Sequence, residues 1–422
     1  MKGVAPDASV AVMKVFGEAN LALDSESLQG LEYAVLHDHV DILSESFGGN
    51  PVPNPGTDPV AAFNADAVAA GVTAVVSIGD AGTTNTIGTP ATAPGLLGTG
   101  ASTTYRLYAQ TGSYGYRVGS GGWESNNVSA ISSSGLTDFG PRTIDVVAPG
   151  EAGWADCSTD TATFGSCADI YHGPHPQPIV AFGGTSESCP LTAGTAALVV
   201  QAYRETHGGA TPSPALVKQI VMSSAQDLHV PAANQGAGLV DALRAVQQAR
   251  SVRDGRGAPA AVGQSLLYSP TSIGLTDRPG RTVPTTVKVT NTGAAARDVT
   301  PALRALGPAR TLAEGDLTLN PATDGTFIYQ TGATVHDVQT VTFTVPAGVD
   351  RLVTRVAWRG NANDLSGAQI RATLFDPAGR LASHSRPQGS GGGFGEDEIH
   401  DPSPGTWKLG ASWRSRRSTS SR

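Results

Sequence analysis

The 422-residue sequence has few charged side chains and no excess of positive charge. Charged residues make up 15% of the chain, 52 residues are Gly and 28 are Pro, and the formal net charge is -8. This composition is typical of a turn-rich globular protein, and a domain size of ~150 residues predicts two or three domains. Without a basic surface, we expect neither nucleic acid nor an anionic membrane as a partner.

Long apolar stretches are also missing. The sequence has no run of about 18 apolar residues, the length that a membrane-spanning helix needs. The first seven residues, Met1 to Asp7, lack the apolar stretch of a secretory signal. We therefore predict no membrane span, and the sequence as written carries no export signal.

Cysteine is scarce, with three residues in the chain. Cys157 and Cys167 flank a short polar segment of a length that one disulfide can close, and such a bridge would indicate an oxidising compartment. The alternative is two unpaired loop thiols, because spacing alone does not establish a bridge.

The first third of the chain alternates strand-like and helix-like segments. Apolar stretches at 9–16, 40–44 and 72–78 predict buried strands, and a further strand is expected at 143–147. Helix starts are marked by Asp24 and by Asp58 with Pro59 behind it. This order predicts a parallel sheet with helices on its faces and a ligand site at the carboxyl ends of the strands.

A serine lies at the start of the next predicted helix, in the segment Gly184-Thr185-Ser186-Glu187. The first amides of a helix are unpaired and its dipole favours negative charge, so Ser186 is placed for nucleophilic attack. Serine is also a common helix cap, which is the plain structural alternative. Cys189, one turn further on, we interpret as a small buried packing residue.

After residue 250, the alternation of strand-like and helix-like segments gives way to a linker and then to strand-like segments. We predict a linker at 251–263, a β-sandwich-like domain at 264–337, a jelly-roll-like domain at 338–412 and a disordered basic tail at 413–422. The expected architecture is thus α/β over residues 1–250, followed by all-β domains. For such β-domains, carbohydrate, cell-wall and protein binding all remain open.

The segment from Gly184 to Pro190 resembles the Gly-Thr-Ser-x-x-x-Pro nucleophile motif of the subtilase family of serine proteases. Segments in the same order along residues 1–250 are similar to further motifs of that family: 3–8, 44–49, 76–82, 146–150 and 236–241. The resemblance implies a subtilisin-like fold, a secreted endopeptidase and protein or peptide substrates. It implies no cofactor, while calcium and the oligomeric state stay open.

The resemblance also assigns roles to residues. Ser186 would attack the peptide carbonyl, and Ser46, Phe47 and Gly48 would pair with the substrate backbone and wall the first specificity pocket. Asp80 occupies the position of the family's oxyanion asparagine. By itself, the 44–49 segment would read as an ordinary strand end.

The family's aspartate and histidine motifs precede the Gly-Val-Ala-Pro segment, which begins here at residue 3. A start assigned too far downstream or a truncated gene would explain their absence, and loss of triad members costs about 10⁴ to 10⁶ in turnover. His37, His39, His172 and His175 are not placed to substitute. The alternative function is a catalytically dead fragment with a binding or structural role.

Asp80 leads to a prediction on pH. An ionised carboxylate would repel an oxyanion, so Asp80 has to be protonated to donate a hydrogen bond. We expect the full-length enzyme to work best at mildly acidic pH, as measured by its pH–rate profile. An optimum above about pH 8 with Asp80 intact would count against this role.

Overall fold

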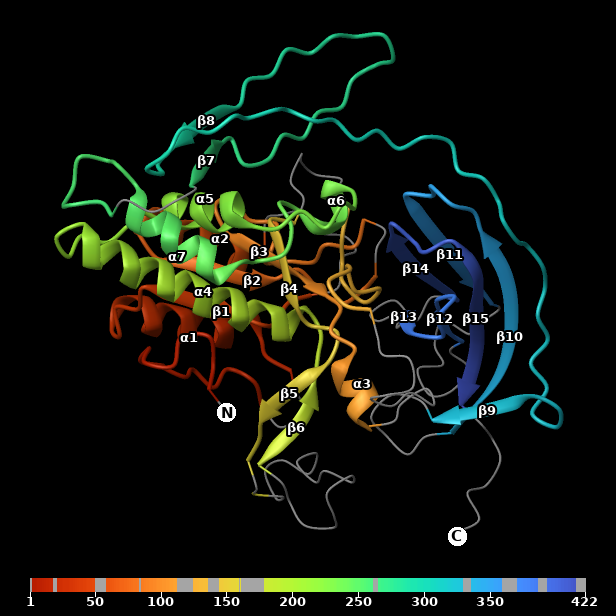
Figure 1. The fold of residues 1–422 in the computed structure, drawn as a ribbon. Helices are drawn as coiled ribbons and strands as arrows, with labels where there is room; N and C mark the ends of the chain where they lie inside the picture. Colours follow the sequence, from red (N-terminus) through yellow and green to blue (C-terminus); the bar gives the residue numbers. More distant parts are fainter. Residues whose placement is uncertain are drawn as a thin grey trace.

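The computed structural model describes residues 2–17, 21–49, 58–82, 85–111, 124–135, 144–158, 160, 178–260, 265–328, 335–358, 370–385 and 393–414. Figure 1 shows an α/β unit built from the first part of the chain and a β-rich unit built from the last part. A long extended segment connects the two along one side of the molecule. The predicted order of an α/β region followed by a β region is confirmed.

A four-stranded parallel sheet forms the centre of the α/β unit, in the order β1-β2-β3-β4. Its strands are β1 (Ile42–Glu45), β2 (Thr73–Ser77), β3 (Leu97–Ser102) and β4 (Val146–Pro149). Strand β2 is buried along its whole length, as expected for a parallel sheet covered on both faces. A short antiparallel pair, β5 (Gly153–Asp156) and β6 (Ile179–Phe182), follows the sheet.

Helices cover both faces of this sheet. Helices α1 (Asp24–Leu36) and α2 (Pro59–Ala69) pack on one apolar cluster, and α4 (Thr185–Thr206), α5 (Pro214–Ser224) and α7 (Ala242–Ser251) pack on the other. Two short helices complete the unit, α3 (Arg106–Thr111) and α6 (Ala232–Gln235). As the sequence indicates, Asp58 caps α2, because its side chain accepts from the Ala61 N–H.

Residues 9–16 do not form the predicted strand. The segment has no regular secondary structure, and Val10 and Val12 are each 80% exposed. Val15 lies against Gly30 of α1, and Met13 packs against the core below. The apolar, β-branched composition indicates a strand only where a neighbour supplies hydrogen bonds, and among the described residues β1 is the edge of the sheet.

The β-rich unit contains a five-stranded antiparallel sheet in the order β13-β12-β15-β10-β9 and a separate β11–β14 pair. Its strands are β9 (Gly325–Ile328), β10 (Val335–Val345), β11 (Arg351–Ala357), β12 (Arg371–Phe375), β13 (Leu381–His384), β14 (Phe394–His400) and β15 (Gly405–Arg414). Trp407 is fully buried at its centre. Trp413 and Arg414 belong to β15 rather than to the predicted tail, whose residues 415–422 lie outside the described part.

A β-sandwich does not form in the described part of 264–337. One hairpin, β7 (Leu266–Ser269) and β8 (Lys288–Asn291), packs on α5 through Leu267, and residues 292–324 run on without helix or strand. The alternating pattern there gives no second sheet, since most of these side chains face solvent; Leu303 is 92% exposed. Two bonds from the Arg304 guanidinium to Asp227 attach this segment to the α/β unit.

The two units share a contact surface. Leu381 of β13 packs into an apolar cluster with Tyr105, Leu107 and Tyr108 of the α/β unit. Beside this cluster, the Asn127 amide donates to the backbone oxygen of Glu398 at 2.7 Å. The β-rich unit is therefore docked on the α/β unit by both packing and hydrogen bonds.

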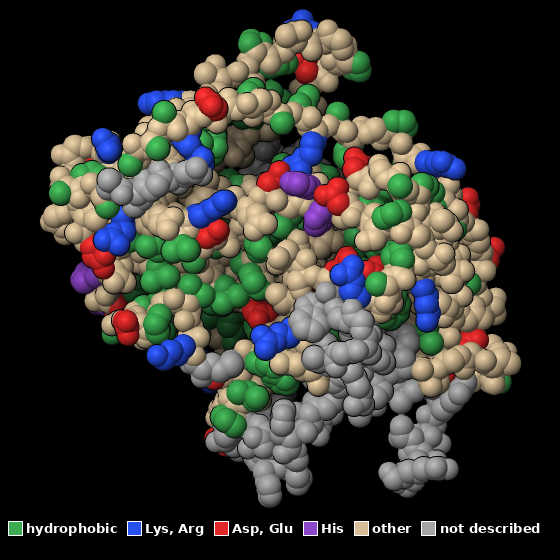
Figure 2. Space-filling model, viewed as in Figure 1, with side chains coloured by type: hydrophobic (Ala, Val, Ile, Leu, Met, Phe, Trp, Pro, Cys, Tyr) green, Lys and Arg blue, Asp and Glu red, His purple; other side chains and the backbone are tan. Residues whose placement is uncertain are grey.

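The outer surface carries mixed charge. Figure 2 shows Lys and Arg side chains interspersed with Asp and Glu over the viewed face. Within the described ranges, no helix is both long and apolar enough to cross a membrane.

The packing of α5 on the sheet can be tested by truncation. Ile220 is fully buried in the cluster of α4, α5 and α7, so Ile220→Ala should cost about 2–5 kcal/mol of unfolding free energy. Leu243→Ala is the matched control, because Leu243 is 68% exposed and its loss should cost little. Chemical denaturation measures both; equal effects would show that α5 is not packed as described.

Candidate active site

Ser186 is the second residue of α4, and the approach to the helix is narrow. Gly184 has φ +99°, a conformation that favours glycine, and a Cβ there would lie 2.3 Å from Asp80 Oδ2. The Gly184 N–H donates to the Gly150 carbonyl at 2.6 Å, which ties the helix start to the end of β4. Residues after two strands therefore set the position of Ser186.

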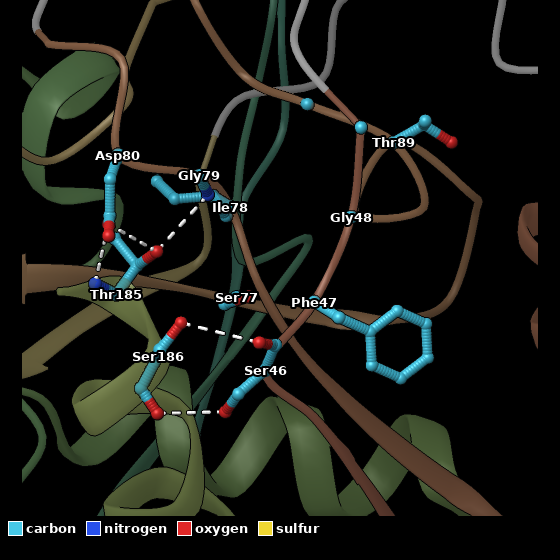
Figure 3. A pocket seen from close by; sticks show the side chains of 12 residues that line it. Ser46, Phe47, Gly48, Ser77, Ile78, Gly79, Asp80, Thr89, Thr185 and Ser186 are labelled. Atoms are coloured by element: carbon cyan, nitrogen blue, oxygen red, sulfur yellow. Dashed lines mark hydrogen bonds between the residues drawn. The ribbon is translucent and has the colours of Figure 1, made fainter. Parts of the chain in front are cut away.

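Asp80 holds the first turn of α4. Its Oδ1 accepts from the Thr185 N–H at 2.7 Å and from Thr185 Oγ1 at 2.9 Å. Thr185 Oγ1 in turn accepts from the Gly79 N–H at 3.2 Å, as Figure 3 shows. The carboxylate thus acts as a cap for the amino end of a 22-residue helix, where the helix dipole favours negative charge.

This geometry differs from the role that the sequence suggests for Asp80. The expected oxyanion donor is seen as an acceptor of two hydrogen bonds from Thr185. Since Oδ1 receives both bonds, a proton on Oδ2 would be needed for donation. Asp80 therefore caps α4, and the oxyanion role that the sequence suggests would come in addition to this structural role.

Ser46 and Ser186 contact each other through two hydrogen bonds. Ser46 Oγ donates to the Ser186 carbonyl at 2.8 Å, and Ser186 Oγ donates to the Ser46 carbonyl at 3.3 Å. Both contacts are visible in Figure 3. The end of β1 and the start of α4 are thereby brought together, as the motif order along the sequence suggests.

A cavity of about 230 Å³ lies between these segments. The five residues singled out from the sequence as catalytic or substrate-binding all line it: Ser46, Phe47, Gly48, Asp80 and Ser186. Its other lining residues are Gly49, Ser77, Ile78, Gly79, Gly88, Thr89 and Thr185. In the sequence, Gly88 and Thr89 carry no chemical signal that marks them as lining residues.

The walls of the cavity approach closely. A Cβ on Gly48 would lie 2.2 Å from the Thr89 carbonyl oxygen, and the Gly49 N–H donates to the same oxygen at 3.1 Å. The Phe47 ring makes an edge-to-face contact with Phe16, with centroids 5.5 Å apart. Apart from Asp80, every side chain of the lining is uncharged.

Two groups near Ser186 have raised pKa values. Burial, followed by the charge of Glu151, raises the pKa of Glu187 to about 8. Burial raises the pKa of the Cys189 thiol to about 11, and the thiol contacts the Val75 and Glu45 carbonyl oxygens. Cys189 is free and fully buried, so it lies behind the cavity as a packing group.

The remaining predicted groups fall elsewhere. Cys157 is disulfide-bonded, while Cys167, His172 and His175 lie outside the described residues. His37 stacks on Tyr33 at the end of α1. No described histidine hydrogen-bonds to Ser186, and the described residues contain no group of three or more His, Cys, Asp or Glu that could hold a metal ion.

Comparison with known proteins places the chain in a family. The model of the subtilase family matches residues 1–239, which is more than half of the chain. The chain belongs to the subtilase family, whose members are serine proteases.

Curated relatives include the membrane-bound transcription factor site-1 proteases. The Rattus norvegicus protein is 29% identical over 251 residues, 58% of this chain and 20% of that protein. The Homo sapiens protein is 28% identical over 283 residues, 66% of this chain and 22% of that protein. The chain thus spans about a fifth of the length of these relatives.

Solved structures with similarity include a lanthipeptide protease, with TM-score 0.43, 21% identity and coverage of 58% of this chain and 71% of that one. The patellamide maturation protease PatA matches with TM-score 0.43, 19% identity and coverage of 60% and 78%.

Asp80→Asn separates the helix-capping contact of Asp80 from the oxyanion role that the sequence suggests for it. The amide oxygen can still accept from Thr185, while the amide nitrogen offers a neutral donor at every pH. We expect turnover on the neutral and alkaline side to rise by up to about 10²-fold relative to wild type. The pH–rate profile of peptide hydrolysis measures this, and superimposable profiles would exclude Asp80 from the oxyanion site.

Glu187→Gln tests the buried carboxyl beside the nucleophile. The folded pKa of about 8 lies above the ordinary 4.5, so unfolding free energy falls as pH rises from about 4.5 to 8. The isosteric amide should remove that fall, which is about 5 kcal/mol by this shift. Denaturation at several pH values measures it, and an unchanged pH dependence would contradict the burial of this carboxyl.

Proposed function

We propose that the chain is the nucleophile-bearing part of a serine endopeptidase in which Ser186 attacks the peptide carbonyl. The observation that carries the proposal is the position of Ser186, at the amino end of α4 and at the wall of a cavity flanked by the 46–49 and 77–80 segments. Such a position combines a partly exposed hydroxyl with the Ser186 N–H, a helical amide that has no acceptor among the described residues.

The proposed reaction begins with a substrate segment that lies along residues 46–48 and displaces the contact between Ser46 and Ser186. Ser186 Oγ then bonds to the carbonyl carbon while its proton passes to a base. The oxyanion lies near the Ser186 N–H, which has no acceptor among the described residues. The peptide C–N bond breaks with protonation of the amine, and water hydrolyses the acyl-enzyme.

Asp80 would contribute to this step in its protonated form. Its carboxyl group lies beside Gly184 and Thr185, at the helix end where the oxyanion forms. A donor at this position is worth about 10² to 10³ in turnover in enzymes of this kind.

Apart from Asp80, which the proposal assigns to the oxyanion, the lining of the cavity supports a neutral side chain on the substrate. Ile78, Ser77 and Thr89 offer methyl groups and hydroxyls but no counter-ion for a charged residue. The mechanism needs no cofactor, because serine and water supply the chemistry. A disulfide at Cys157 supports an extracellular or other oxidising location.

Chemical rescue tests the proposal and locates the base. A fluorophosphonate probe should label the chain at Ser186 and should not label Ser186→Ala; Ser188→Ala is a matched control, since Ser188 Oγ is bound to the Ala148 carbonyl behind the site. If the base is missing from the chain tested, imidazole in the buffer should increase labelling of the wild type.

The outcomes separate the candidate functions. Labelling that depends on Ser186, with or without imidazole, supports an endopeptidase site. A folded sample that stays unlabelled under both conditions would contradict the proposal and favour an inactive, binding role.

A further inference from the structure

Glu45 is a buried acid directly before the substrate-binding segment. It ends β1, and only 1% of its surface is exposed. Its side chain points to the face covered by α2, where the Asn64 amide donates to Oε2 at 2.8 Å. The next residue along the chain is Ser46, which contacts the nucleophile.

The hydrogen bonding of this pair is incomplete for an ionised acid. Glu45 Oε1 and Asn64 Oδ1 are both buried, and neither has a hydrogen-bond partner. Two buried acceptors without a donor would each carry a desolvation penalty. A proton on Oε1 would satisfy both atoms, because Oε1 could then donate to Asn64 Oδ1. The acid and the amide would thus exchange two hydrogen bonds in a ring.

We propose that Glu45 is a neutral carboxylic acid paired with Asn64 through two hydrogen bonds, and that this pair positions the 46–48 wall of the cavity. The first part stands on the buried oxygens alone; the second part rests on the proposed function. Glu45 is thus a positioning residue, which acts on the substrate through Ser46.

The surroundings of Glu45 favour the neutral form. Its register partner in β2 is Val76, and Cys189 of α4 contacts its backbone oxygen through an uncharged thiol. Asp58 at the start of α2 is the charged group that acts on it, and its sign opposes ionisation. Burial, against the bond from Asn64, raises the pKa of Glu45 to about 7.

The sign of the pH effect follows. A folded pKa above the ordinary 4.5 means that stability falls as pH rises from about 4.5 to 7, and is constant above that. Over this pH range, the unfolding equilibrium constant should rise about 300-fold. Because the acid adjoins Ser46, its ionisation would strain the wall of the cavity in the same pH range.

Glu45→Gln tests the pair, since a glutamine amide can make both hydrogen bonds at every pH. Between about pH 4.5 and 8, the unfolding equilibrium constant of wild type, measured by denaturation, should rise about 300-fold more than that of the variant. Asp58→Asn keeps the helix cap and removes the opposing charge, so the wild-type transition should move to lower pH. Parallel curves for all three proteins would overturn the proposal.

Two further readouts complete the test. Glu187 is also protonated at about pH 6, so the test is a difference spectrum: the infrared band of protonated carboxyls should lose the contribution of one group in Glu45→Gln relative to wild type. Calcium that stabilises wild type but not Glu45→Gln would instead show a cation between these oxygens and contradict the neutral pair.

The positioning role has its own measurement. The Michaelis constant for a peptide should rise with pH more steeply in wild type than in Glu45→Gln, while equal slopes would exclude positioning. If neither wild type nor the variants hydrolyse peptide, the proposed function fails. The denaturation and infrared results still decide whether Glu45 is protonated.

Discussion

The hydrogen bonds from Thr185 to Asp80 hold the start of α4 against the segment that follows β2, and the position of Ser186 depends on them. The Asp80 carboxylate caps a helix of 22 residues through the Thr185 N–H and Oγ1, and the same hydroxyl receives the Gly79 N–H. This fixes the start of α4 against the end of β2, so that Ser186 projects beside the cavity. The constraint explains why Gly184 must be glycine, since the carboxylate occupies the space of a Cβ.

A second set of contacts reaches from this helix start into the β-rich unit. Gly184 is bonded to Gly150, and the next residue, Glu151, accepts from Tyr108 Oη at 3.1 Å. Tyr108 belongs to the apolar cluster that also contains Leu381 of β13. The β-rich unit is therefore in contact with the scaffold of the nucleophile, and changes in its docking can reach the site through a few residues.

Much of the fold could be predicted from local patterns. Alternating strand and helix patterns predict the parallel sheet, because start signals such as Asp58 with Pro59 act through neighbours in the chain. The segments that depend on partners were less predictable. Residues 9–16 look like a buried strand but find no neighbouring strand in the described part, and the apolar residues of 292–324 find no second sheet.

The residues of the site could be predicted where sequence motifs mark them. The side-chain contacts between segments far apart in the chain could not. The resemblance to the subtilase motifs singles out Ser186, Asp80 and the 46–48 segment, and the structure brings them to one cavity. That Asp80 accepts from Thr185, and that Glu45 meets Asn64 across the sheet, depends on side-chain directions in three dimensions. No sequence pattern reports these.

The most direct test of the account is to identify the atom that attacks a bound peptide. A peptidyl phosphonate ester with a neutral side chain, incubated with the chain and mapped by mass spectrometry, is predicted to form an adduct on Ser186. An adduct on any other residue of a folded sample would contradict the assignment of the nucleophile.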